Sequence, residues 1–192
     1  MRPRGIDVIA NSEAIADRLD ALVQGIGRFM AWSNVVLIGV ILLQVILRYG
    51  FDRPMASLEE LMWHLNGLAF LLGASYALSR DSHIRVDVIH TGLSSRKQQW
   101  IEILGILLLL YPFLAVVFFH SLDWVAESYR WGESSPNPTG LPYRWMIKAT
   151  IPLGFSLLFL AATARLLREI ARLAGHRPEP PDALTRRLSG KS

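Results

Sequence analysis

The amino-acid sequence predicts an all-α integral membrane protein with four transmembrane helices. Hydrophobic residues make up 52% of the 192 residues and charged residues only 19%, and the apolar residues are gathered into four long runs. A helical run of about 20 apolar residues matches the roughly 30 Å hydrocarbon core of a bilayer. The chain has no cysteine, which excludes disulfides, thiolate catalysis and cysteine-ligated metal centres.

The amino-terminal segment, residues 1–28, is predicted to form an amphipathic helix that is cytoplasmic or interfacial. Its apolar residues recur at steps of three and four residues, at Ile15, Leu19, Leu22, Val23 and Ile26. Three charged residues, Asp17, Arg18 and Asp20, fall off this stripe. We expect the segment to lie at the membrane surface or to lead into the first span. A cleavable signal peptide is not expected, because the following apolar run is long enough to stay in the bilayer.

Four spans are predicted from runs that charged residues bracket, at residues 29–47, 61–79, 102–122 and 145–165. Gly50 and Pro54 interrupt the helix after the first run, so the first two spans are expected to form a hairpin. The third span contains Pro112, where neighbouring helices are expected to tolerate a kink. Lys148 lies in the first turn of the fourth span, where its long side chain is expected to reach outward to water.

The remaining segments are predicted to connect or flank a membrane domain of residues 29–167. Residues 123–143 are predicted to form a loop, because GESSPNPTGLP within them holds three prolines and two glycines. Ser94 and Ser95 offer an N-cap for the helix of the third span. Residues 168–192 are predicted to form a basic cytoplasmic tail.

Lysine and arginine are distributed unevenly between the connecting segments. Fifteen of the twenty lie in the amino-terminal segment, in the loop after the second span and in the carboxy-terminal tail. Under the positive-inside rule, both termini are therefore predicted to be cytoplasmic. The formal net charge of +4 is explained by these flanking residues, so no nucleic-acid partner is predicted.

The candidate interface residues lie in and just after the second span: Glu59, Glu60, His64, Ala69, Gly73, Ala77, Arg80, His83 and Asp87. The three small residues among them recur every fourth position, which predicts a strip where another helix packs closely. Leu72, one position round the helix from Gly73, is expected to face lipid. His64 shares a face with Glu60 and is expected to hydrogen-bond to it or to a neighbouring helix.

Two histidines suggest an alternative function. His64 and His120 fall near the same end of the second and third spans, and two histidines on facing helices of a four-helix bundle can ligate haem iron. The protein would then be a cytochrome b-like membrane electron carrier. A channel would instead need a polar stripe through several spans, and Gln44, Asn66 and a few serines are too sparse to form one.

No catalytic, cofactor-binding or metal-binding residue is predicted. The sequence contains no glycine-rich phosphate loop, no G-x-S-x-G and no H-E-x-x-H motif. These absences argue against an enzyme and predict that the bilayer and other proteins are the partners of this chain.

Four stretches carry a family resemblance, and they follow one another over most of the chain. They are Arg48 and Tyr49 after the first span, Glu59 and Glu60 before the second, LAFLLGASYALSRDSHIRVDVI at 68–89, and GLPYRWMIKATIPLGFSLLFL at 140–160. Together they resemble the small membrane subunit, of the DctQ type, of tripartite ATP-independent periplasmic (TRAP) transporters. In that family a tryptophan commonly precedes the paired acids, whereas Ala, Ser and Leu occupy 56–58 here.

The resemblance implies a bacterial inner-membrane protein and a division of labour among three components. A periplasmic binding protein captures an organic acid, a large membrane subunit carries it across with sodium, and the small subunit braces the large one. The stretch at 140–160 also resembles family members grouped with oxoacid or other carboxylate systems. No cofactor is implied.

Overall fold

The computed structural model describes residues 4–80 and 94–174, and these residues form helices and connecting loops with no strand among them. The helices are α1 (Arg4–Gly50), α2 (Ala56–Ser79), α4 (Ser95–Gly105), α5 (Tyr111–Arg130), α6 (Trp145–Lys148) and α7 (Thr150–Leu173), with a π-helical turn, η1 (Ile106–Leu110), between α4 and α5. The candidate residues His83 and Asp87 lie outside the described residues.

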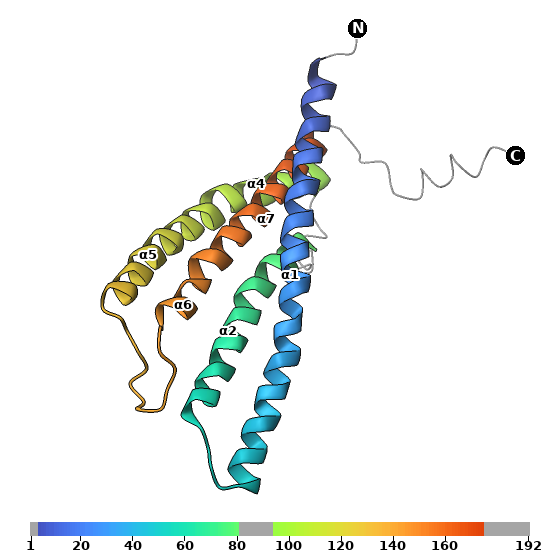
Figure 1. Cartoon of the computed structure of the whole chain (residues 1–192). Helices are drawn as coiled ribbons and strands as arrows, with labels where there is room; N and C mark the ends of the chain where they lie inside the picture. The colour runs from blue at the N-terminus through green and yellow to red at the C-terminus, as the bar shows by residue number, and fades with distance from the viewer. Residues whose placement is uncertain (1–3, 81–93, 175–192) are drawn as a thin grey trace, which may run out of the picture.

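Four helical stretches are long and apolar enough to cross a membrane: Ser12–Gly50, Ala56–Ser79, Arg96–Arg130 and Trp145–Leu173. The prediction of an all-α protein with four spans is confirmed to that extent. The amino-terminal end of α1 and the carboxy-terminal end of α7 lie together at one end of the bundle, and the α1–α2 and α5–α6 loops lie at the other (Figure 1).

α1 is one continuous helix of 47 residues, so the amino-terminal segment leads directly into the first span, which is one of the two arrangements expected for it. The face that this helix packs against the bundle shares Val23 with the predicted apolar stripe and includes residues outside it. Ala16, Asp20 and Val23 are buried, whereas Ile15 and Leu22 are both more than half exposed. Asp20 falls off the predicted apolar stripe, and its burial is explained by an ion pair with Arg168 of α7.

α7 lies between the α1–α2 hairpin and the arch formed by α4, η1 and α5 (Figure 1). Several of its buried residues are small, and at Gly154 an added Cβ would lie 3.1 Å from Cβ of Leu71 on α2. Each of the longer helical elements contributes to the buried core around α7, which consists of Val23, Leu78, Ile106, Leu114, Ala161 and Ala162. α7 is therefore the element against which the other spans pack.

The third span contains an irregular turn close to its proline. η1 ends two residues before Pro112, which lies in the first turn of α5. Proline has no N–H to donate and its ring crowds the carbonyl of the preceding turn, so a wider π-helical turn here accommodates it within one continuous helical span. The irregularity expected at Pro112 therefore takes the form of a π-helical turn within the arch of the third span.

α5 continues to Arg130, eight residues beyond the end predicted for the third span. The residues from 123 to 130 include no glycine or proline, and the ring of Tyr129 meets the ring of Trp145 edge-on at 5.5 Å. Just beyond the end of the helix, Gly132 has a φ of +55°, the left-handed conformation that glycine adopts without a steric penalty. The N–H of Glu133 then donates to the carbonyl oxygen of Ser128 at 3.0 Å.

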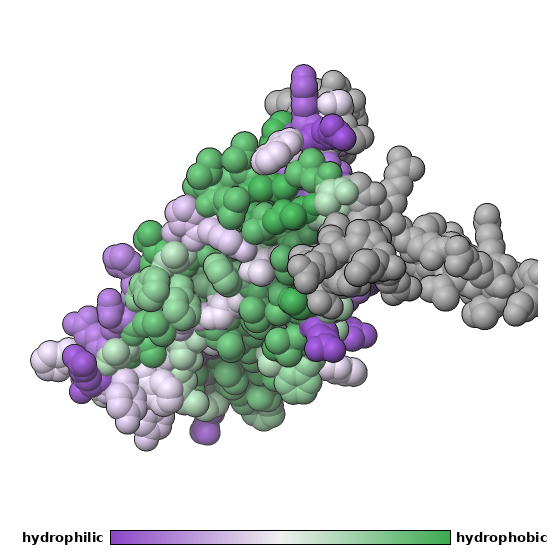
Figure 2. Space-filling model, turned by 90° about the horizontal axis from the view of Figure 1, so that it is seen from above, coloured by the Kyte–Doolittle hydropathy of each residue, from purple (hydrophilic) through white to green (hydrophobic). Residues whose placement is uncertain are grey.

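Large apolar side chains remain exposed along the outer sides of the spans. Hydrophobic residues cover most of the central surface seen from above, with hydrophilic residues towards its margins (Figure 2). On α1 and α5 they include Val35, Val36, Ile38, Leu42, Ile46, Phe113, Val116 and Phe119. Such a surface is stable in a lipid environment, where exposed apolar area carries no cost.

Candidate functional site

Charged and polar side chains gather at the two ends of the bundle. At the end that holds the helix-connecting loops, one group forms the loop cluster: Glu60, Glu133, Ser135, Asn137, Leu141, Arg144 and Lys148. At the end that holds the helix termini, another group forms the terminal cluster: Asp17, Asp20, Glu102, Arg165, Arg168, Glu169 and Arg172. Each cluster ties together elements that are far apart in the sequence.

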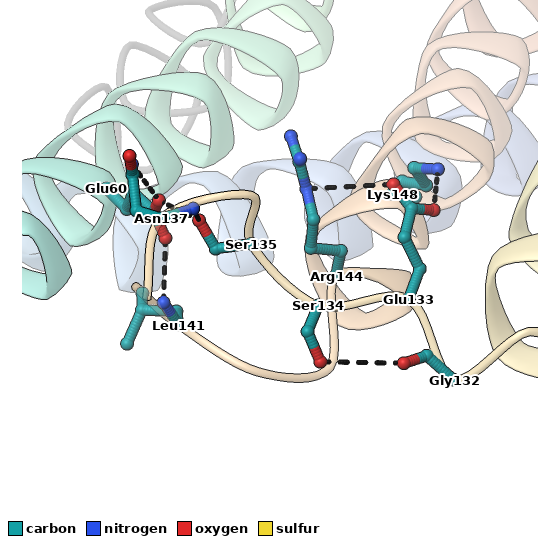
Figure 3. Close-up of polar contacts among 9 residues, drawn as sticks. All are labelled: Glu60, Gly132, Glu133, Ser134, Ser135, Asn137, Leu141, Arg144 and Lys148. Carbon is teal, nitrogen blue, oxygen red and sulfur yellow. Dashed lines mark hydrogen bonds and ion pairs between the residues drawn. The ribbon is translucent and has the colours of Figure 1, made fainter. Parts of the chain in front are cut away.

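Glu60, in the first turns of α2, holds the loop between α5 and α6 (Figure 3). Its Oε1 accepts hydrogen bonds from the hydroxyl of Ser135 and from Nδ2 of Asn137, the latter at 2.9 Å. Its Oε2 accepts a hydrogen bond from the backbone N–H of Leu141 at 2.7 Å. Hydrogen bonds to an ionised carboxylate are stronger than those between neutral groups, so this one side chain fixes the position of the loop relative to α2.

The loop also stabilises its own shape. The N–H of Ser135 donates to the carbonyl oxygen of Leu141 at 3.1 Å, and the N–H of Gly140 donates to that of Asn137 at 2.9 Å. A Cβ at position 140 would lie 2.7 Å from Oε1 of Glu60, so only glycine fits there without displacing the carboxylate. The residues that predicted a loop in the sequence therefore also build the pocket that receives Glu60.

Glu133 connects the same loop to the start of the fourth span. Its carboxylate pairs with Nζ of Lys148 and lies 3.8 Å from Nε of Arg144 (Figure 3). The hydrogen bond from Lys148 lowers the pKa of Glu133 below its ordinary value. Lys148 was expected to reach outward to water, but its side chain is 10% exposed and its Nζ lies 4.2 Å from the centre of the Trp124 ring. That prediction is wrong, because α5 extends far enough to cover the lysine.

Glu59, next to Glu60, turns to α1 instead of to the loop. Its Oε1 accepts a hydrogen bond from Nε2 of Gln44 at 3.2 Å and lies 3.7 Å from the guanidinium of Arg48. The amide oxygen of Gln44 accepts a hydrogen bond from the N–H of Met55 at 3.4 Å. The paired acids thus have separate structural roles, since one closes the α1–α2 hairpin and the other holds the α5–α6 loop.

The terminal cluster pairs basic residues of α7 with acidic residues of α1 and α4. Arg168 donates to Oδ1 of Asp17 at 2.8 Å and also to Asp20, while Arg165 pairs with Glu102. A polar cavity of about 350 Å³ lies beside these pairs, and Arg80 lines it. Sequence reasoning missed this cluster. The available signal was helical spacing, because the acids at 17 and 20 and the arginines of α7 each recur at three- or four-residue steps.

The two histidines of the haem hypothesis are not brought together. α2 packs on α1 and α7, and α7 lies between α2 and α5, so His64 and His120 are on helices that do not face each other. His120 is exposed, with Nδ1 2.8 Å from the carbonyl oxygen of Val116 in its own helix. The carboxylate of Glu60, the expected partner of His64, is bound by the loop. The two-histidine haem site is therefore not formed.

The small-residue strip of the second span lies partly at the surface. Ala69 and Ala77 are half-buried, but Gly73 is exposed and a Cβ added to it would meet no atom within 4 Å. Leu72 is buried at 1% exposure, so the expectation that it faces lipid is wrong. Within the subunit, close packing of α1 against α2 occurs instead at Gly27, where an added Cβ would lie 2.7 Å from Cβ of Tyr76.

The comparisons with known proteins agree with this architecture. The family model described as "Tripartite ATP-independent periplasmic transporters, DctQ component" matches residues 37–172, which is more than half of the chain. A comparison with curated proteins gives no match. The matched residues include the whole loop cluster and most of the last three spans. The chain therefore belongs to the DctQ component family of tripartite ATP-independent periplasmic transporters.

Proposed function

We propose that the chain is a small permease subunit that braces a large transport subunit of a TRAP transporter. In this proposal the large subunit takes up an organic acid, a carboxylate or an oxoacid, in a sodium-driven step, and a periplasmic binding protein delivers that acid. Membership of the DctQ family is the observation that carries the proposal. The family is a transporter component, which argues against a catalytic role for this chain.

The distribution of polar contacts supports a bracing role. Secondary transporters bind substrate and ions near the bilayer midplane, at helices that are interrupted there. In this chain, ion pairs between described residues lie in the loop cluster, in the terminal cluster and at the Arg48–Glu59 contact near the α1–α2 loop, all of them near the ends of the bundle. Polar groups that connect the helix ends stabilise a rigid bundle. Binding and translocation of the substrate are then left to the large subunit.

The first expected result is that the purified subunit alone moves no organic acid. Proteoliposomes that contain only this chain should show no uptake of a radiolabelled carboxylate or oxoacid, with or without an inward sodium gradient. Uptake should appear only when the large subunit and the binding protein are also present. Sodium-dependent uptake by this chain alone would contradict the bracing role.

We also propose an inner-membrane location with both termini in the cytoplasm. The uneven distribution of lysine and arginine supports this orientation, and the amino-terminal end of α1 lies at the same end of the bundle as the carboxy-terminal end of α7. The loop cluster would then face the periplasm, on the side from which a binding protein arrives.

Single cysteines test this orientation, because the native chain has none. Thr139 is exposed in the α5–α6 loop and Ala174 is exposed at the end of α7. In cells with a permeabilised outer membrane, a membrane-impermeant maleimide should label Thr139→Cys and spare Ala174→Cys. Both cysteines should react after detergent lysis. Labelling of Ala174→Cys alone in intact cells would reverse the proposed topology.

A further inference from the structure

Two hollows lie one after the other along the seam between α1 and α2, and together they are called the seam grooves here. The first, of about 490 Å³, is lined by residues that include Leu37, Ile41, Gln44, Arg48, Trp63 and Asn66. The second, of about 190 Å³, is lined by residues that include Gly27, Ala31, Asn34, Ala69, Gly73 and Tyr76. The seam grooves thus extend from the Gln44–Glu59 contact to the close approach of Gly27 and Tyr76.

The seam grooves open on the side of the hairpin that does not pack against α7. α2 buries Leu72, Ser75 and Leu78, and Leu78 belongs to the core around α7. The opposite side of α2 turns Trp63, Asn66, Phe70 and Gly73 outward, and all four are exposed. Among residues 4–80 and 94–174, none covers this outer face of the hairpin.

The outer face carries amide side chains at membrane depth. Asn66 lies near the middle of the 24-residue α2, and Asn34 lies within the first apolar run of α1; both are exposed. Nδ2 of Asn34 donates to the carbonyl oxygen of Ala31 at 3.3 Å, which uses one of the hydrogen bonds that an amide can form. In hydrocarbon an amide needs protein partners, since lipid tails offer neither donors nor acceptors.

The exposed surface of α5 therefore differs in composition from the outer face of the α1–α2 hairpin. The middle of α5 exposes Phe113, Val116 and Phe119, a surface that lipid tails solvate well. The outer face of the hairpin combines exposed amides, an exposed glycine and two hollows. Small residues that admit a second backbone and polar side chains that bond across helices are the two features that mark helix–helix contacts in membranes.

From this contrast we propose that the outer face of the α1–α2 hairpin docks a transmembrane helix of the large transport subunit. The partner helix passes close to Gly73 and offers hydrogen-bonding side chains or backbone groups at the depth of Asn34 and Asn66. The inference rests on the proposed function, because it names the surface by which the chain braces its partner. A second copy of this chain is the competing occupant, and the tests below distinguish the two.

The first test is site-directed crosslinking in membranes that contain the assembled transporter. A benzophenone maleimide attached to Gly73→Cys should give an adduct with the large subunit on illumination. The matched control is Val116→Cys, on the exposed apolar side of α5, which should give no such adduct. An adduct at position 116 but not at 73, or an adduct of position 73 with another copy of this chain, would overturn the proposal.

The second test is a pair of glycine substitutions, Gly73→Leu and Gly39→Leu. Both glycines are exposed and helical, and an added Cβ at either would meet nothing within 4 Å. The thermal stability of the isolated subunit in detergent should therefore change equally in the two variants. Gly73→Leu alone should weaken binding of the large subunit by roughly tenfold or more, because an isobutyl group removes close backbone contact.

The outcomes separate this inference from the proposed function. If wild-type chain co-purifies with the large subunit and both leucine variants bind it equally well, the docking face is wrong while the bracing role stands. If the wild-type chain does not bind the large subunit at all, the bracing role fails as well. Loss of binding in Gly73→Leu with retention in Gly39→Leu supports both.

Discussion

Gly27→Leu should destabilise the isolated subunit far more than Gly25→Leu, although the two glycines are two residues apart on α1. An added Cβ at position 27 would lie 2.7 Å from Cβ of Tyr76, which is part of the rigid base of that side chain, whereas one at position 25 meets nothing within 4 Å. α1 and α2 must separate to admit the leucine. Overpacking of this kind typically costs about 1 to 3 kcal/mol.

The measurement is thermal unfolding in detergent, followed by tryptophan fluorescence, for the wild type and both variants. Both variants replace a glycine by leucine inside α1, so both gain the same helix propensity. A difference in stability between the two variants therefore reports the packing at position 27. A lower midpoint for Gly27→Leu only is the expected result. Equal midpoints for the two variants would show that the hairpin does not depend on close approach at this point.

The spans were predictable because the bilayer imposes a length and a composition on each one. The interruption at Gly50 and Pro54 correctly predicted the hairpin, since α1 ends at Gly50 and α2 begins at Ala56. The end of the third span was placed too early, because Asp123 and Glu127 were taken as loop residues. Charged side chains on an exposed helix end need no partner in the bundle, so charge alone does not show where a helix stops.

The loop cluster was only half predictable. The paired acids Glu59 and Glu60 were identified as candidates from their position and from the family resemblance, and both make contacts between elements. Their partners could not be identified, because Ser135 and Asn137 are 75 and 77 residues away from Glu60 in the sequence. Local sequence patterns predict where helices and turns occur. The pairing of a carboxylate with a loop far away in the sequence depends instead on how the helices pack.

The terminal cluster shows where the amphipathic pattern misleads. Asp20 falls off the predicted apolar stripe of the amino-terminal helix, yet it is 4% exposed. A charge is buried when an opposite charge accompanies it, and here Arg168, 148 residues later, supplies that charge. Helical spacing places the acids on one face of α1 and the arginines on one face of α7, but it does not show that these two faces meet.

Arg168→Ala should therefore be the most destabilising single change in the terminal cluster, on the order of 3 kcal/mol. It leaves the carboxylate of Asp20 buried without a cation, and removal of one member of a buried pair typically costs about 3 to 5 kcal/mol. We take the lower end of that range because the side chain of Arg168 is 34% exposed. Asp17→Asn is the matched control: Asp17 shares the same guanidinium but its side chain is 73% exposed, so its loss should cost about 0 to 1 kcal/mol.

The double variant Asp20→Leu/Arg168→Leu separates the cost of an unpaired charge from the value of the pair itself. Replacement of a buried ion pair by apolar side chains is often neutral, so the double variant should recover most of the stability that Arg168→Ala loses. The free energies of unfolding of the wild type, Asp20→Leu, Arg168→Leu and the double variant in detergent give the coupling energy between the two residues. A double variant much less stable than the wild type would show that the pair contributes net stability, and that α1 is held to α7 by the attraction between these charges instead of by the packing around them.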